Sequence, residues 1–205
     1  MTTTTIQPSE IDTTIRAANP TVNYGTSTVL QIGVTSGYPY RTLIKWDLSG
    51  IPSSEICDSA TLSLWLDVDA APTYAITFGV YRILRNWGET TVTWNKYDGT
   101  NNWTTAGASG AGDMDATLLG ESASISQTTP VGTEIQISLS TAEIQKMYDG
   151  TYTNYGFVIK SMREDLGSRW DSCSREHATT GNRPKLVVVT HSSGVATFIP
   201  GAIWF

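Results

Sequence analysis

Residues 61–68, which read TLSLWLDV, indicate the fold class most directly. Leu62, Leu64, Leu66 and Val68 stand at every second position, and the residues between them are mostly polar. A period of two is that of a β-strand with one face on a core and the other toward solvent. The stretch therefore predicts an amphipathic strand that carries Trp65 on its outer face.

The same period recurs along the chain. Residues 44–48 and 135–139 alternate in the same way, whereas residues 186–189 are apolar on both faces and belong in the middle of a sheet. Strands are expected at 11–16, 29–34, 40–47, 60–68, 75–84, 134–139, 156–161, 168–174 and 184–191. Closely spaced strand signals are typical of an all-β sandwich, here of about nine or ten antiparallel strands.

One short helix is expected after residue 139. Ser140 and Glu143 have the spacing of a capping box, and Gly150 stands where it can end the helix. Its apolar face would consist of Ile144, Met147 and Tyr148. Residues 96–124 form a Gly-, Asn-, Thr- and Ser-rich stretch that is too long for a plain connection, so it is expected to be a loop that carries binding residues.

The chain is expected to form one domain, because no linker interrupts it. We assign residues 1–10 to an N-terminal arm, 11–191 to the sandwich and 192–205 to an apolar C-terminal tail. The net charge of −6, without a basic cluster, argues against a nucleic-acid partner. No apolar run approaches the roughly 20 residues of a membrane span, so no membrane insertion is expected. Residues 1–5 are not a signal peptide, since they have neither a basic nor an apolar region.

Catalytic and metal motifs are not apparent. Cys57 and Cys173 are the only cysteines, and we expect two buried free thiols in preference to a disulfide. They match no zinc motif unless His177 and His191 both join them. No nucleophile elbow or phosphate loop occurs, so the protein is not expected to be an enzyme. No cofactor is expected, and a structural calcium is left open.

A series of short motifs resembles the DNRLRE domain family and a related alginate-binding family of carbohydrate-binding modules. In order they are Asp12-Thr13, Asn23-Tyr24-Gly25, Arg41 to Leu48, Ser59 to Leu62, Trp87-Gly88-Glu89, Val92 to Asn95, Trp103, Asn154 to Phe157, Ser174-Arg175-Glu176 and Arg183 to Leu186. The resemblance spans about residues 10–191. It implies a jelly-roll β-sandwich, usually non-catalytic, that occurs on secreted polysaccharide-degrading enzymes and cell-surface proteins. Judged by their chemistry, the motif residues themselves are mostly structural.

Glycan-binding candidates are therefore sought among exposed aromatic residues, because a sugar ring stacks on an aromatic plane while its hydroxyls take hydrogen bonds. Trp65 is the first candidate, and the alternative is that a loop or helix covers it. Tyr97 and Trp103, which flank Asn101 and Asn102, come next; the alternative for Trp103, from its place among the motifs, is an anchor of the loop. For an acidic polysaccharide, Lys45, Arg82 and Arg85 are the candidate cationic partners.

The C-terminal tail suggests a second kind of partner. Its apolar residues are Phe198, Ile199, Ile203, Trp204 and Phe205. Such a segment needs a covering surface, either its own sandwich or another subunit. We accordingly expect a non-catalytic component of an assembled extracellular particle or surface, such as a phage decoration, head-fibre or tail protein. The alternative is the polysaccharide-binding module of a secreted enzyme, and a jelly-roll polysaccharide lyase is a more distant third.

Overall fold

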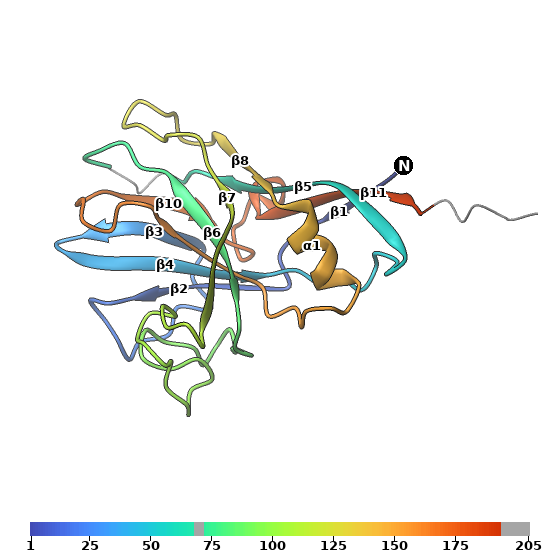
Figure 1. Cartoon of the computed structure of the whole chain (residues 1–205). Helices are drawn as coiled ribbons and strands as arrows, with labels where there is room; N and C mark the ends of the chain where they lie inside the picture. Colours follow the sequence, from blue (N-terminus) through green and yellow to red (C-terminus); the bar gives the residue numbers. More distant parts are fainter. Residues whose placement is uncertain (68–71, 194–205) are drawn as a thin grey trace, which may run out of the picture.

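Two antiparallel β-sheets pack face to face in the computed structural model, which describes residues 1–67 and 72–193 (Figure 1). The first sheet has the strand order β1 (Thr2–Ile6), β11 (Lys185–Ser192), β5 (Glu55–Trp65) and β8 (Glu134–Leu139). The second has the order β10 (Arg169–Cys173), β3 (Val29–Thr35), β4 (Tyr38–Lys45), β9 (Phe157–Ser161), β6 (Phe78–Ile83) and β7 (Met114–Glu121), and β2 (Ile11–Arg16) also pairs with β4. The predicted all-β sandwich is confirmed, with eleven strands among the described residues.

The main core lies between the two sheets. Leu62, Leu64 and Leu66 are at most 1% exposed, which confirms the inward face of the alternating stretch. Opposite them, the second sheet contributes Ile44 and Phe157 to the same core cluster. Strand β11 lies between β1 and β5, as its apolar sequence predicted.

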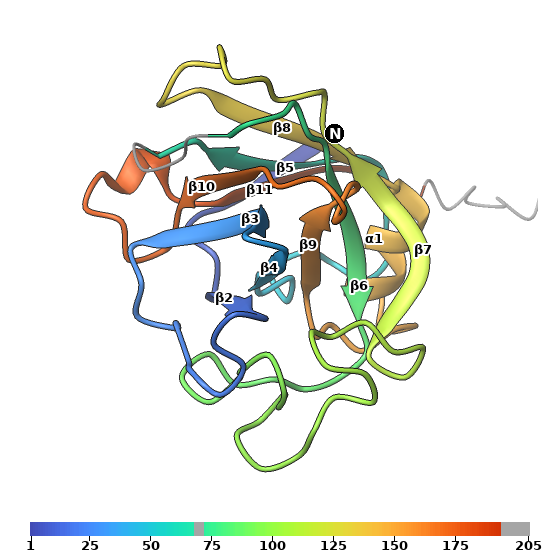
Figure 2. The same ribbon diagram turned by 90° about the vertical axis from the view of Figure 1, so that its left-hand side faces the viewer.

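A second core covers the outer face of the seven-stranded sheet. Residues 84–113, which connect β6 to β7 and are called the 84–113 segment below, fold back on that face (Figure 2). Trp87 and Trp103 of the segment pack with Leu43 and Val158 of the sheet, all at most 4% exposed. Both faces of this sheet are thus buried at its centre, which explains why β3 and β4 contain runs of consecutive buried residues.

Two strands were not predicted. Strand β1 lies within the segment expected to be an arm and pairs with β11, and β7 lies within the stretch expected to be a loop. The helix α1 (Thr141–Tyr148) has the predicted buried face, and Gly150 follows it with a φ of 86°. The predicted capping box does not form, because Ser140 makes no side-chain cap and Glu143 pairs with Lys146 Nζ at 2.7 Å.

Candidate functional site

Two Asn-Tyr-Gly turns have the same internal hydrogen bond. The side-chain oxygen of Asn23 accepts the N–H of Gly25, and that of Asn154 accepts the N–H of Gly156, both at 3.0 Å. Each asparagine amide then ties its turn to a distant segment. Asn23 Nδ2 donates to the carbonyls of Glu89 (2.8 Å) and Val92 (2.7 Å), and the Nδ2 of Asn154 to that of Trp46 (2.8 Å). These turns therefore hold loops in place.

A buried acidic network joins three of the other motifs. Asp12 is 1% exposed, its N–H donates to Glu89 Oε1 at 2.9 Å, and its Oδ2 accepts the N–H of Arg175 at 3.0 Å. The guanidinium of Arg175 lies 3.4 Å from Glu89 Oε1. Burial, together with the charges of Glu176 and Glu89, raises the pKa of Asp12 to about 7, although hydrogen bonds from Ser9 and Arg175 act to lower it. The network links β2, the 84–113 segment and the turn after β10.

The 84–113 segment is held by its own polar contacts as well as by its core. Trp87 Nε1 donates to the carbonyl of Tyr155 at 2.8 Å, and Trp103 Nε1 donates to that of Thr93 at 3.0 Å. Asp113 is fully buried, and burial alone would raise its pKa. Backbone N–H groups of the segment, including that of Thr104 at 2.9 Å, lower the pKa overall. These hydrogen bonds and the second core hold the 84–113 segment in one conformation.

A groove of about 400 Å³ lies between the 84–113 segment and the connection from β2 to β3. Its lining residues are Thr21, Asn23, Thr91, Thr93, Asn95, Lys96, Gly99 and Asn102. A smaller hollow of about 220 Å³, lined by Asn95, Asn102, Trp103 and Ala106, shares two of these residues. Within the described residues, no side-chain hydrogen bond joins Asn95 or Asn102 to another residue; Asn95 is partly buried and Asn102 is exposed. We call the two hollows together the asparagine groove.

A family model described as "Disaggregatase related repeat domain" matches residues 12–188, from β2 to β11. The chain belongs to this family. No curated protein matches the chain. Membership of the DNRLRE or alginate-binding families stays a prediction for this disaggregatase-related repeat. Among the described residues of the repeat, no helix is long and apolar enough to span a bilayer.

Tyr97, Trp103 and Arg85 come together in the repeat's 84–113 segment. The rings of Tyr97 and Trp103 lie 5.6 Å apart between centroids, and the Arg85 guanidinium carbon is 5.6 Å from the Tyr97 ring. Trp103 is only 4% exposed, so it anchors the loop and has no open face for a sugar. Tyr97 is half-buried against the same core. Of these aromatic candidates, Trp103 lines the smaller hollow of the asparagine groove, and Tyr97 packs against Trp103.

Trp65 does not have the open ring face that was predicted from its position on the outer side of the strand. It is half-buried on the four-stranded sheet, and Lys185 Nζ of the neighbouring strand lies 4.9 Å from its ring centroid. The same ammonium group pairs with Glu134 Oε1 at 3.1 Å. The Lys185 ammonium group thus lies over the indole, because a long side chain on β11 can reach across to β5.

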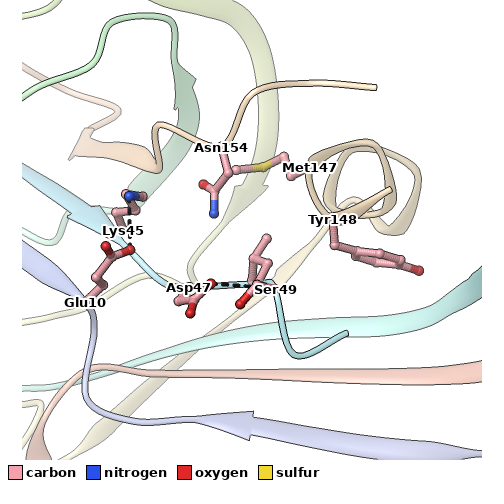
Figure 3. Close-up of a pocket in the computed structure, with 8 residues that line it drawn as sticks. Glu10, Lys45, Asp47, Ser49, Met147, Tyr148 and Asn154 are labelled. Carbon is pink, nitrogen blue, oxygen red and sulfur yellow. Dashed lines mark hydrogen bonds and ion pairs between the residues drawn. The ribbon is translucent and has the colours of Figure 1, made fainter. Parts of the chain in front are cut away.

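The remaining cationic candidates lie apart from the groove. Arg82 pairs with Asp115 at 2.6 Å, and its guanidinium carbon is 3.9 Å from the Tyr152 ring. Lys45 pairs with Glu10 at 3.0 Å in a separate hollow of about 420 Å³ between β4 and α1 (Figure 3). There, hydrogen bonds from Ser49 lower the pKa of Asp47, so this carboxyl is unsuited to act as a general acid. Each of the three cationic candidates is paired with a carboxylate of its own, since Arg85 lies 3.5 Å from Asp113.

The other sequence-based expectations fall in two groups. Cys57 and Cys173 are buried free thiols, as expected. The tail residues Phe198, Ile199, Ile203, Trp204 and Phe205 lie outside the described residues, and the assembly role assigned to them stays a prediction. Asn95 and Asn102 were missed as binding candidates, although Asn95 is itself a motif residue and Asn102 stands beside the motif residue Trp103.

Proposed function

We propose that this repeat is a non-catalytic polysaccharide-binding domain and that the asparagine groove is its binding site. The observation that carries the proposal is the pair of unengaged amides, Asn95 and Asn102, on a rigid loop scaffold. An amide offers both donors and an acceptor, which matches the hydroxyls of a sugar. The groove volume of about 400 Å³ lies in the range of about 300–1,000 Å³ typical of small-molecule sites.

The lining chemistry favours binding over catalysis. The described lining residues carry amides, hydroxyls and one ammonium group, that of Lys96, which donates to the carbonyl of Gly99 at 3.3 Å. Glycoside hydrolysis ordinarily needs two carboxyl groups about 5–10 Å apart across the scissile bond. None of these lining residues supplies a carboxyl group. We therefore expect no hydrolysis or lyase activity on bound polysaccharide.

The family description adds support of a different kind. A domain that recurs as a repeat suits binding, because several weak sites in one chain raise avidity without any new contact. A single copy is then expected to bind weakly, and the affinity of a multi-repeat chain to depend on polymer length.

Binding is tested by affinity electrophoresis and calorimetry of the purified domain against plant, algal and bacterial polysaccharides. We expect Asn95→Ala combined with Asn102→Ala to weaken binding at least about tenfold, since each amide loses one or more hydrogen bonds of about 1 kcal/mol. Gln136→Ala, which removes an exposed amide from β8, is the control. If Trp65→Ala abolishes binding and the double variant does not, the site lies on the four-stranded sheet and the groove assignment fails.

A component of an assembled extracellular particle is the second candidate. The observation in its favour is the apolar sequence of residues 195–205. Partner subunits bound through this tail would make the glycan-binding domain an adhesion element of the particle. Deletion of the tail, described below, separates this function from glycan binding, because the groove lies elsewhere in the chain.

A further inference from the structure

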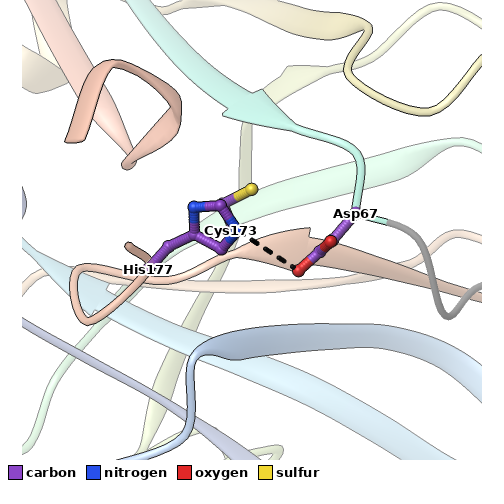
Figure 4. A group of neighbouring side chains, drawn as sticks. All are labelled: Asp67, Cys173 and His177. Atoms are coloured by element: carbon purple, nitrogen blue, oxygen red, sulfur yellow. Dashed lines mark ion pairs between the residues drawn. The ribbon is translucent and has the colours of Figure 1, made fainter. Parts of the chain in front are cut away.

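Three potential metal ligands of different chemistry meet at one edge of the sandwich (Figure 4). They are Asp67, which follows β5, Cys173 at the end of β10, and His177 in the turn beyond it. One carboxylate oxygen, the thiol sulfur and one imidazole nitrogen all lie within 4.8 Å of one another. His177 Nε2 is 3.8 Å from Asp67 Oδ2. The groups converge although Asp67 is far from the other two in sequence.

The backbone fixes this convergence. A β-bridge joins Leu66 to Ser172, and the N–H of Asp67 donates to the carbonyl of Asp171 at 2.8 Å. These bonds bring the end of β5 beside the end of β10. The N–H of His177 then donates to the carbonyl of Ser174 at 3.2 Å, closing a turn that returns the imidazole to Cys173. The ligand atoms are therefore brought together by strand pairing and a tight turn.

The same three residue types also occur in cysteine-nucleophile triads, but this arrangement does not suit one. Cys173 is 2% exposed, which leaves no approach for a substrate. The side chains of Asp67 and His177 are 13% and 20% exposed, so a small ion can reach the cluster from solvent.

We propose that Asp67, Cys173 and His177 bind a zinc ion, with a solvent molecule as the fourth ligand. Sulfur, nitrogen and carboxylate oxygen are the donors that zinc takes, whereas calcium takes oxygen alone. With bonds of about 2.0–2.3 Å, tetrahedral coordination places ligand atoms about 3.3–3.6 Å apart. The 3.8 Å between His177 Nε2 and Asp67 Oδ2 is a few tenths of an ångström from that spacing.

The second nitrogen of His177, Nδ1, lies beside both backbone groups of Thr179. It accepts the N–H of Thr179 at 3.2 Å and lies 3.4 Å from the carbonyl oxygen of the same residue. Metal binding at Nε2 places the ring proton on Nδ1, so Nδ1 then gives up the N–H and donates to the carbonyl, which is the outer contact that metal-bound histidines ordinarily make. Arg183 Nε donates to the carbonyl of His177 at 2.9 Å and steadies the turn from the other side.

The expected consequence is a cross-link between the two sheets. Asp67 continues β5 of the four-stranded sheet, and Cys173 ends β10, at the edge of the seven-stranded sheet. An ion bound to both raises the stability of the native state with the logarithm of one plus the ratio of its concentration to its dissociation constant. Zinc therefore acts here as a structural clip, independent of glycan binding at the groove.

The test uses Co²⁺ as a spectroscopic substitute for Zn²⁺ on the reduced, metal-free full chain. We expect one Co²⁺ per chain, a thiolate-to-cobalt charge-transfer band, displacement by Zn²⁺, and a rise in melting temperature with Zn²⁺. Cys173→Ser should abolish the charge-transfer band, and His177→Gln should weaken Co²⁺ binding more than about tenfold. Cys57→Ser, which removes the other buried thiol, should change neither.

The proposal is overturned by a charge-transfer band that survives Cys173→Ser, by equal affinity in His177→Gln, or by an absence of Co²⁺ binding to the wild-type chain. If Cys173→Ser does not fold, the half-buried His177→Gln variant still decides the question through its affinity and its response to Zn²⁺. None of these outcomes depends on whether the protein binds polysaccharide.

Discussion

Replacement of Asp12 by Asn should remove much of the pH dependence of stability. Asp12 is 1% exposed on β2, and the main effect on it is the loss of hydration, which disfavours the carboxylate. The hydrogen bond from Ser9 Oγ, at 2.6 Å, acts in the opposite direction but does not compensate for burial. Glu176, whose own pKa is raised by burial, adds repulsion.

The sign and size of this pH dependence follow from the linkage between protonation and folding. The pKa of Asp12 rises on folding from 3.8 to about 7, so folding is favoured while the group is protonated. The resulting stability is fully present below about pH 4 and is lost progressively as the pH rises to about 7. Because one pKa unit corresponds to 1.36 kcal/mol, a pKa that is higher by about 3 corresponds to a loss of about 4 kcal/mol in the free energy of unfolding over that interval.

Urea unfolding at intervals between pH 4 and pH 8 measures this directly. The unfolding free energy of the wild type should fall as the pH rises toward neutral, and this fall should be absent in Asp12→Asn. Asp98→Asn is the control, since backbone and side-chain hydrogen bonds from Asn101 lower the pKa of Asp98 and give its contribution to the pH dependence the opposite sign. A variant whose pH profile runs parallel to that of the wild type would show that Asp12 is ionised in the native state throughout, contrary to the argument from burial.

Three further predictions concern packing and the tail. In chemical denaturation, Gly107→Ala should destabilise the protein by about 1–3 kcal/mol more than Gly132→Ala. Both glycines have φ near 80°, but only at Gly107 would a Cβ lie 2.5 Å from the Trp94 ring. Equal losses of stability would contradict the packing of the 84–113 segment. Trp65→Ala should cost less than the roughly 3–5 kcal/mol of a buried tryptophan, since the indole is half-buried under Lys185; a loss in that range would make it a core residue. Deletion of residues 195–205 should leave a folded domain of lower oligomeric order, as measured by analytical ultracentrifugation, whereas an unfolded product or an unchanged monomer would refute the assembly role.

The sequence alone determined the elements that have a strong period and a buried face. The alternation at 61–68 and 134–139 predicted β5 and β8 because a strand between core and solvent repeats its apolar residues every second position. The buried face of α1 followed in the same way from Ile144, Met147 and Tyr148. Strands β1 and β7 were missed, since one is almost entirely threonine and the other is mostly exposed, and neither shows alternation with a buried face.

Only the tertiary structure decided which side chains are free to act. The outward phase of Trp65 was deduced correctly, yet Lys185 from a strand 120 positions later covers its ring. Likewise, Trp103 is in a polar loop by sequence but in a second core by structure, because the 84–113 segment folds back on the sheet. The asparagine groove and the Asp67–Cys173–His177 cluster depend on the same cause. Their residues come from segments that only strand pairing and loop packing bring together, and no local pattern in the sequence records such long-range contacts.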